Sequence, residues 1–345
     1  MKVALDATPL STPTGGIRRY VDELYHALIR CFPEDDYRLV SDQPFPGGRT
    51  PPRASWFDRR WWLIGVQREM RRLGCELFHG VDFAVPYLPL RPSVITIHDL
   101  SPWREDTQAD AASRVRRRTP WLLRLGIPTM VLTPTEAVRK EVISRFRLKP
   151  ERVVAVPLAA APHLRKTSAP PGNYFLFVGT LTRRKNLFTL IEAWRLLRQH
   201  AVVNMVVAGR EAPGGCVIRP EQGLRVLGAV GETELADLYS GAMACVYPSL
   251  YEGFGLPVLE AMQCGAAVLA SRDAALCEVA GGAAVHIDAT DVRGWAAAML
   301  KVATDPDWRE DLRRRSLARA AAFSWERTAR LTHEVYRETL DRFGR

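Results

Sequence analysis

Short runs of apolar residues alternate with stretches of helical periodicity along the chain. Apolar runs bounded by glycine, proline or polar residues predict buried strands, whereas apolar positions at helical spacing predict one buried face of a helix. Strands that alternate with helices in both halves predict an α/β fold with two doubly wound parallel sheets. The predicted strands lie at 3–5, 37–40, 76–79, 94–98, 130–133 and 152–156, and then at 174–178, 204–208, 225–227, 244–247 and 267–270.

A change in composition separates the two series of strands. Residues 162–172 are polar and rich in proline, a composition typical of an interdomain linker. We therefore expect a first domain over residues 1–165 and a second over residues 172–325. The last 45 residues are arginine-rich with helical periodicity, and residues 326–345 are expected to pack back on the first domain. Ligands of such sheets bind beyond the carboxyl ends of the strands, so these loops are the first place to look for chemistry.

The composition limits the class of protein. Of 345 residues, 47% are hydrophobic and 25% are charged, which is typical of folded domains and excludes a disordered or collagen-like chain. Lysine and arginine number 48 against 38 acidic residues, so the net charge of +10 favours an anionic partner. The six cysteines show no CxxC spacing, which indicates reduced thiols and a cytoplasmic protein. No apolar stretch reaches about 18 residues, so no membrane-spanning helix is expected.

The densest candidate for chemistry is the segment 247–262. Glu252 lies in a glycine-flanked turn after a predicted strand, and Glu260 lies about one turn inside an otherwise apolar helix. An exposed loop acid and an exposed helical acid are the alternative. The apolar neighbours of Glu260 instead favour a buried, hydrogen-bonded carboxylate that faces a ligand. Backbone N–H groups at the helix entrance can bind an anion; they belong to Gly253, Phe254 and Gly255.

Three consecutive cations form a second candidate site. Arg183, Arg184 and Lys185 follow the predicted strand 174–178 in a loop that opens with a glycine. Cations in such a loop suit a diphosphate, although ordinary surface charges are the alternative.

Two weaker candidates lie in the first half. Gly15 and Gly16 follow Thr14 and precede a predicted helix, where the missing side chains let the backbone approach a phosphate; a plain turn is the alternative. His98 precedes Asp99 at the end of the predicted strand 94–98, which places it at the ligand-binding rim. A core histidine bonded to the backbone is the alternative for His98.

Together these features resemble the retaining family-4 glycosyltransferases of the GT-B fold. The similarity covers nearly the whole chain and is most specific at residues 252–260, which fit the family's E-x7-E pattern in an EGFGLPxLEAM context. Residues 179–186, 96–100 and 323–326 resemble its mannosyltransferase-like branch. The resemblance implies two Rossmann-like domains that face an interdomain cleft, the first for the acceptor and the second for a nucleotide sugar.

The resemblance also implies residues that bind the donor. Lys185, with Arg184, would hold the donor diphosphate. Gly16, beside Gly15, would border the β-phosphate. Glu260 would accept hydrogen bonds from the hydroxyls of the donor ribose.

Further residues would contact the transferred sugar. Glu252 would lie by this sugar, His98 would contact it near the reacting carbon, and the N–H groups of residues 253–255 would meet its hydroxyls or the phosphate. Many relatives carry an arginine where this chain has Thr180. The cationic role then falls to the following loop, and the sequence does not show whether Arg183 or Arg184 points inward.

The chemistry of glycosyl transfer agrees with these residue types. Breaking a sugar–phosphate bond develops negative charge on the diphosphate, which fixed cations and N–H dipoles stabilise without a metal or other cofactor. Asp305 and Asp307 match the DxD sequence pattern, but they precede a charged helix and indicate a helix cap instead of a metal site. No acid is marked as a covalent nucleophile, so the resemblance implies front-face displacement with retention.

Two basic segments suggest a surface partner. Residues 53–72 hold six arginines, and residues 114–118 hold four more just before Trp121. Arginine with tryptophan is typical of an interfacial helix, so one hypothesis is that the first domain lies on an anionic membrane. A solvated, partly packed helix pair is the alternative. Aromatic residues interleaved in the first segment are Trp56, Phe57, Trp61 and Trp62.

The leading functional hypothesis is retaining transfer of a hexose, with mannose favoured, to a glycan or lipid-linked acceptor in cell-surface polysaccharide synthesis. GDP-mannose is the first donor, and UDP- or dTDP-sugars, including a rhamnose donor, stay open. A nucleic-acid-binding protein would fit the charge, but no nucleic-acid motif is present and the glutamate pair has no role in it. Another GT-B enzyme, such as a sugar-nucleotide epimerase, needs no acceptor. We expect a cytoplasmic enzyme, peripheral on the inner face of a membrane.

Overall fold

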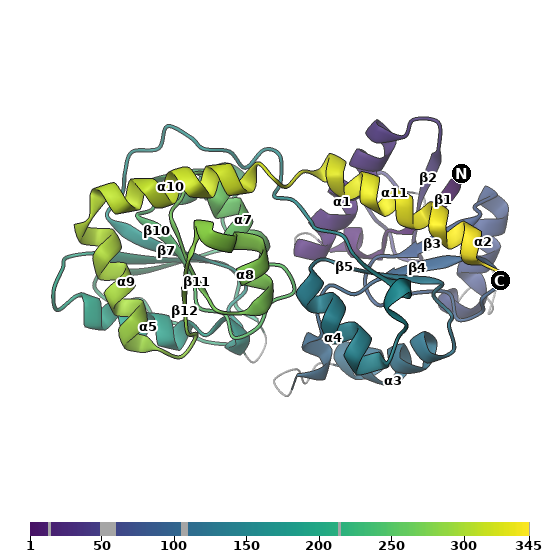
Figure 1. Cartoon of the computed structure of the whole chain (residues 1–345), viewed down its shortest axis with the longest axis horizontal. Coiled ribbons are helices and arrows are strands. Elements are labelled where there is room, and N and C mark those ends of the chain that lie inside the picture. The colour runs from purple at the N-terminus through teal and green to yellow at the C-terminus, as the bar shows by residue number, and fades with distance from the viewer. Residues whose placement is uncertain (13–14, 49–59, 105–109, 213–214, 345) are drawn as a thin grey trace. The chain divides into compact units, whose positions relative to one another are not determined.

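Two compact units make up the chain in a computed structural model that describes residues 1–12, 15–48, 60–104, 110–212 and 215–344 (Figure 1). The first unit comprises Met1–Leu158 and Ser324–Arg345, and the second comprises Ala159–Phe323. Residues 159–165, which the composition assigned to the first domain, therefore lie in the second unit. Each unit holds one six-stranded parallel sheet, so the α/β class predicted from the strand pattern is confirmed.

The first sheet has the order β2-β1-β3-β4-β5-β6. Each of the six apolar runs predicted in this half forms one of its strands. Strand β2 lies on one side of β1 and the later strands lie on the other, so the order reverses between β1 and β3. Loops that follow the two strands at such a reversal leave room for a ligand. The strands are β1 (Lys2–Asp6), β2 (Asp36–Val40), β3 (Leu77–Gly80), β4 (Ser93–Thr96), β5 (Met130–Thr133) and β6 (Val153–Ala155).

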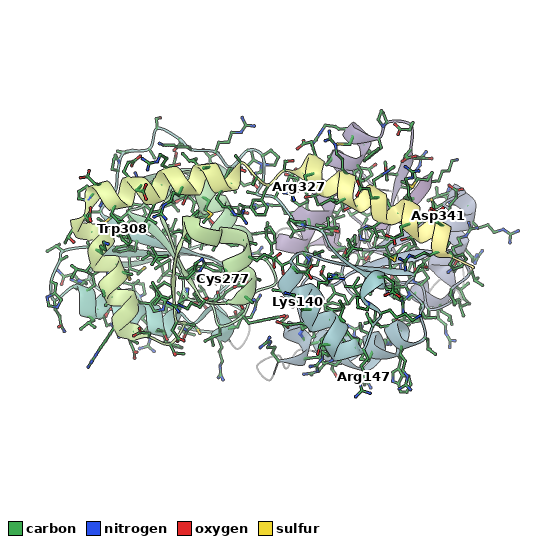
Figure 2. All side chains as sticks on the ribbon, in the orientation of Figure 1. Lys140, Arg147, Cys277, Trp308, Arg327 and Asp341 are labelled. Carbon is green, nitrogen blue, oxygen red and sulfur yellow. The ribbon has the colours of Figure 1, made fainter. Side chains whose placement is uncertain are left out.

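Helices of the first unit include one that comes from the end of the chain. Helix α11 (Trp325–Arg342) packs against α1 (Gly16–Cys31), and Arg327 and Asp341 mark its first and last turns (Figure 2). The other helices are α2 (Val66–Leu73), α3 (Asp110–Arg124) and α4 (Glu136–Phe146). None of the helices across the described ranges is both long enough and apolar enough to cross a bilayer.

The second sheet has the order β12-β11-β10-β7-β8-β9. Its first strand, β7, lies beside its fourth, β10, so the order reverses between β7 and β10, as in the dinucleotide-binding sheets. Strand β12 is the one that the apolar pattern missed, because it is three residues long and only its last residue is buried. The strands are β7 (Tyr174–Val178), β8 (Asn204–Ala208), β9 (Leu224–Gly228), β10 (Ala244–Tyr247), β11 (Val268–Ser271) and β12 (Val285–Ile287).

Six helices surround the second sheet in the described part of this unit. Helices α5 and α9 pack side by side, and α10 packs along α7 (Figure 1). Asp305 caps α10, since its Oδ1 accepts a hydrogen bond from the Trp308 N–H at 2.9 Å. The prediction that the DxD pattern marks a helix cap is therefore confirmed. The helices are α5 (Leu187–Leu197), α6 (Glu232–Gly241), α7 (Leu256–Gln263), α8 (Ala274–Ala280), α9 (Val292–Thr304) and α10 (Pro306–Ala320).

Candidate donor site

The reversal point of the second sheet carries the strongest sequence candidates. The loop after β7 holds the three consecutive cations, and the loop after β10 holds Glu252. Because β7 and β10 are neighbours in a parallel sheet, their carboxyl ends meet at the same edge. The topology thereby brings together two segments that lie more than 60 residues apart in the chain, as the 67-residue separation of Lys185 and Glu252 shows.

A buried cluster of charges forms between these two loops. The Lys185 Nζ atom donates to Glu252 Oε1 at 2.5 Å, and Arg184 Nη1 donates to Glu252 Oε2 at 3.1 Å. Lys185 Nζ also donates to the Tyr247 hydroxyl at 2.5 Å and lies 4.7 Å from the centre of its ring. Lys185 is 7% exposed and Glu252 is 6% exposed. The loop cations and the first glutamate thus form one hydrogen-bonded cluster.

The electrostatics of the cluster favour an ionised Glu252. Burial by itself raises the pKa of this carboxyl, but the Lys185 and Arg184 cations outweigh burial and hold its pKa below the ordinary value. Two cations against one carboxylate give these three side chains one net positive charge. Such a charge is suited to an anionic ligand group.

Asn186 ties the cation loop to the rest of the unit. Its backbone has φ of 55°, a left-handed conformation that asparagine tolerates better than most residues. Its Nδ2 atom donates to the carbonyls of Pro248, at 3.2 Å, and Ala289, at 2.6 Å. The Leu250 N–H donates to the Arg184 carbonyl at 2.8 Å. The two loops therefore hold each other, which fixes the charged side chains before any ligand arrives.

Helix α8 fixes the other side of the Glu252 turn. Asp273 caps this helix by accepting hydrogen bonds from the N–H groups of Ala275 and Leu276, at 3.0 and 3.2 Å. Burial raises the pKa of Asp273, although backbone donors, among them the N–H of Glu252, oppose the shift. One carboxylate thus caps the helix and holds the backbone of the turn.

The entrance of α7 requires glycine at position 255. Gly255 has φ of +90°, and a Cβ atom there would lie 2.3 Å from the Leu276 side chain. Phe254 is buried and its ring packs edge-to-face on Phe323, with 6.0 Å between the ring centres. Pro257 lies in the first turn of the helix, as its sequence position predicts. The N–H groups of Gly253, Phe254 and Gly255 accordingly belong to a rigid helix entrance.

Glu260 is a buried acid on α7. It is 3% exposed, which rules out the exposed-acid alternative, and its Oε2 accepts a hydrogen bond from the Tyr239 hydroxyl at 3.3 Å. Burial, and then the Glu260 charge, raise the pKa of Tyr239 well above its ordinary value, so this phenol stays a donor. Arg183 and Thr180 are exposed on the loop after β7. Of the two arginines, Arg184 is the one that contacts Glu252.

The candidates of the first half lie in the first unit. Gly15 and Gly16 line a pocket of about 420 Å³, while Thr14 lies outside the described residues. The His98 Nε2–H donates to the Val81 carbonyl at 2.9 Å, and its ring packs edge-to-face on Tyr20. Burial lowers the pKa of His98, which keeps the ring neutral. These contacts match the alternative interpretation of the sequence, in which His98 is bonded to the backbone.

Three residues of the site were not assigned a role from the sequence, although two of them lie within the segments 179–186 and 247–262. Tyr247 ends a buried strand, and an aromatic residue there is usually part of the core. Asn186 before a helix is an ordinary helix-start residue, and Asp273 is an ordinary cap. Tyr247 contacts Lys185, Asp273 accepts from the N–H of Glu252, and Asn186 donates to the carbonyls of two other residues. All of these contacts depend on pairs of loops that only the folded sheet brings together.

The aromatic residues of the two basic segments differ in how far they are exposed. Trp61 is 5% exposed and packs with Phe78 in the core of the first unit, and Trp62 is partly buried against the same cluster. Trp61 is therefore unavailable to a membrane. Trp56 and Phe57 lie outside the described residues. Trp121 on α3 is 62% exposed.

Comparison with known proteins decides the family. Residues 14–162 match the family model described as Glycosyltransferase Family 4, and residues 161–319 match Glycosyl transferases group 1. The chain is 30% identical to the O-antigen chain mannosyltransferase B of Escherichia coli over 381 aligned positions, which cover 98% of this chain and 100% of the relative. The chain belongs to the family-4 glycosyltransferases. This family-4 enzyme is a transferase, and the nucleic-acid-binding alternative is set aside.

Solved structures agree on the fold of this family-4 glycosyltransferase. Sucrose-phosphate synthase from Thermosynechococcus elongatus matches with a TM-score of 0.74 and 20% identity over 98% of both chains. Anabaena HepE, solved in complex with UDP and glucose, matches with a TM-score of 0.70 and 16% identity over 98% of this chain and 100% of that chain. At these identities the likeness concerns the fold alone, and it confirms the expected GT-B class.

Proposed function

We propose that this enzyme transfers a hexose, with mannose favoured, from a nucleotide sugar to a glycan or lipid-linked acceptor, with retention at the anomeric carbon, in cell-surface polysaccharide synthesis. The observation that carries the proposal is the buried cluster of Arg184, Lys185 and Glu252 at the reversal point of the second sheet. The 30% identity to an O-antigen chain mannosyltransferase over the whole chain supports the choice of sugar and pathway class.

The cluster supplies what departure of a diphosphate requires. Negative charge grows on the diphosphate as the sugar–phosphate bond breaks, and the net positive charge of Lys185, Arg184 and Glu252 stabilises it. The cost of positioning these cations is met during folding, because Glu252 and Tyr247 already hold the Lys185 ammonium. In this proposal no metal or other cofactor is needed, because protein cations and N–H groups at the α7 entrance stabilise the leaving group.

The remaining candidate residues take roles toward the donor and its sugar. Glu260 accepts hydrogen bonds from the ribose hydroxyls, and Glu252 lies by the transferred sugar. Gly15 and Gly16 border the β-phosphate. His98 contacts the sugar through Nδ1 in this proposal, because its Nε2–H is engaged with the Val81 carbonyl.

A panel of donors tests this proposal. GDP-mannose, UDP-glucose and dTDP-rhamnose are each incubated with the enzyme, with and without a mannose oligosaccharide that carries an alkyl tail, and nucleotide release is measured. We expect release of GDP that depends on the acceptor, with product in which the anomeric configuration of the donor is retained. Acceptor-dependent release of UDP or dTDP alone would replace GDP-mannose by another donor. Release that never depends on an acceptor would contradict transfer.

A lipid-linked acceptor accords with the exposed face of α3, which we propose rests on an anionic membrane. Trp121 and Leu125 are 62% and 70% exposed at the end of this helix, beside the exposed Arg117 and Arg124. Apolar side chains with flanking arginines match the surface of an anionic bilayer in both polarity and charge.

Flotation with vesicles tests the membrane proposal. We expect binding to vesicles containing phosphatidylglycerol at low salt, loss of that binding at high salt, and loss in the Trp121→Ser variant. Val202→Ser is the matched control, because Val202 is an apolar residue of the second unit that is 89% exposed. No flotation of the wild type at low salt, or equal loss in the control, would contradict the proposal.

A further inference from the structure

Four buried polar side chains meet inside the first unit, and each comes from a different element. Each of them is at most 2% exposed. Apolar side chains are the ordinary filling of such a place, so a polar set there needs its own explanation. The four residues are Tyr20 on α1, His79 on β3, Thr96 on β4 and Tyr336 on α11.

His79 connects this polar set to the end of the chain. Its Nδ1 lies 2.6 Å from the Tyr336 hydroxyl, and its Nε2 lies 2.7 Å from the Thr96 hydroxyl. Burial, and then the charge of His98, lower the pKa of His79 to about 3, so the ring is neutral. A neutral imidazole has one donor and one acceptor nitrogen, so His79 donates to one of the two hydroxyls and accepts from the other.

Thr96 extends the hydrogen-bonded chain to Tyr20. The hydroxyl oxygens of these two residues lie 3.1 Å apart. The Tyr20 ring also packs on the ring of Trp325, the first residue of α11, with 6.3 Å between the ring centres. Helix α11 therefore reaches Tyr20 twice, once through the Trp325 ring and once through the hydrogen-bonded chain.

The Tyr20 ring packs in turn against His98. The two ring centres lie 4.8 Å apart with 83° between the ring planes, which is the edge-to-face geometry that aromatic rings favour. The Nε2–H of His98 donates to the Val81 carbonyl at 2.9 Å. That bond restrains one atom of the imidazole, and the contact with Tyr20 restrains the plane of the ring. The direction in which Nδ1 points thus depends on Tyr20.

We propose that Tyr20 is a positioning residue for His98: the hydrogen-bonded chain fixes the Tyr20 ring, and this ring fixes the imidazole that contacts the transferred sugar. The inference rests on the proposed function, which gives His98 that contact. A preset orientation speeds the chemical step, because the imidazole needs no rotation as the sugar–phosphate bond breaks.

The ring nitrogens of His98 report its orientation without any substrate. Long-range proton–nitrogen NMR of protein with nitrogen-labelled histidine gives the tautomer of each ring, and His98→Gln identifies the signals of this residue. We expect the wild type to show a single Nε2–H tautomer, as the bond to the Val81 carbonyl requires. Tyr20→Leu should give a mixture of tautomers, because the imidazole can then rotate away from Val81.

A second tyrosine of the first unit supplies the matched control. Tyr37 on β2 is 4% exposed, and its hydroxyl donates to Asp35 at 3.1 Å. Tyr37→Leu and Tyr37→Phe therefore delete the same groups as the Tyr20 variants, and they measure what a loss of stability alone does. Neither is expected to change the His98 tautomer.

Turnover measures the consequence for the reaction. Tyr20→Leu is expected to lower kcat with GDP-mannose by about tenfold, the upper value of an aromatic pair, and to leave the donor KM within about twofold. Tyr20→Phe keeps the ring and loses the bond to Thr96, so kcat should fall by only about threefold. The corresponding Tyr37 variants should keep kcat near that of the wild type.

Tyr336→Phe tests the contribution of α11. This variant is expected to move the NMR signals of both His79 and His98. A change at His79 alone would overturn the role of α11.

Two results would overturn the proposal as a whole. One is a folded Tyr20→Leu variant with the His98 tautomer and the kcat of Tyr37→Leu. If Tyr20→Leu does not fold, wild-type His98 signals and wild-type kcat in Tyr20→Phe are the other. Failure of the proposed function would differ, because no donor would then be consumed by the wild type, while the His98 signals would still respond to the Tyr20 variants.

Discussion

Replacing Lys185 by methionine removes the ammonium group but keeps most of the volume of the side chain. In the folded protein this ammonium lies 2.5 Å from Glu252 Oε1 and from the Tyr247 hydroxyl. Removing one partner of a buried ion pair costs about 3–5 kcal/mol. Arg184 still donates to Glu252 Oε2 at 3.1 Å in the variant, so we expect a loss nearer about 2–3 kcal/mol for the second unit.

A double-mutant cycle isolates the interaction from the effect of each substitution. Lys185→Met, Glu252→Gln and the double variant are unfolded in urea, and amide exchange in peptides from α5 and α7 reports the second unit separately from the first. The expected coupling energy is about 2 kcal/mol at neutral pH. The exposed pair Arg195 and Glu221, with 2.9 Å between Nε and Oε1, is the matched control, and its coupling should stay below about 1 kcal/mol.

The pH dependence of the coupling has a definite sign. The pKa of Glu252 is lowered in the folded protein, so the stabilisation is present above the ordinary glutamate pKa and is lost as the pH falls through the lowered value. The coupling between Lys185 and Glu252 should therefore fade in acid. A coupling near zero at neutral pH, or one that grows in acid, would refute the description of a buried, ionised pair.

Three further predictions follow from individual carboxyl groups. Asp273→Ala removes the cap of α8 and the anchor of the Glu252 turn, so the second unit should lose about 1 kcal/mol in urea unfolding and turnover should fall. Glu260→Gln should weaken nucleotide binding by roughly tenfold in calorimetry while the melting temperature stays near that of the wild type. Burial raises the pKa of Asp82, which follows β3 in the first unit, to about 7, so ionising this carboxyl destabilises the folded state as the pH rises through about 7. Asp82→Asn should therefore stabilise the first unit by about 1–3 kcal/mol at about pH 8, and by nothing at about pH 4, in urea unfolding.

The fold was largely predictable because buried parallel strands are short, apolar and bounded by turn residues. The strand at 174–178 is such a run and lies where it was predicted. Strand β12 was not predictable, because an edge strand of three residues buries one side chain and leaves no apolar run. The order of the strands was also beyond the sequence pattern, since it depends on which loops cross over the sheet.

The sequence predicted which charged residues belong to the site, but it did not predict which of them pair with one another. The cations at 183–185 and the acid at 252 stand out as polar residues directly after buried strands. That Arg184 and not Arg183 contacts Glu252 depends on the fold of the loop, which a sequence of three like charges does not reveal. Asp82 gave no signal at all, because a lone acid after a strand is common, and only the fold shows that its carboxyl has no partner among the described residues.

The central claim is that Lys185 and its neighbours bind the diphosphate of the donor. Titration calorimetry of GDP and GMP against the wild type and Lys185→Met tests it most directly, with UDP and UMP as a second pair. We predict that the wild type binds the diphosphate at least about tenfold more tightly than the monophosphate, and that this difference vanishes in Lys185→Met. Equal binding of the two nucleotides by the wild type, or a difference that Lys185→Met retains, would contradict the claim.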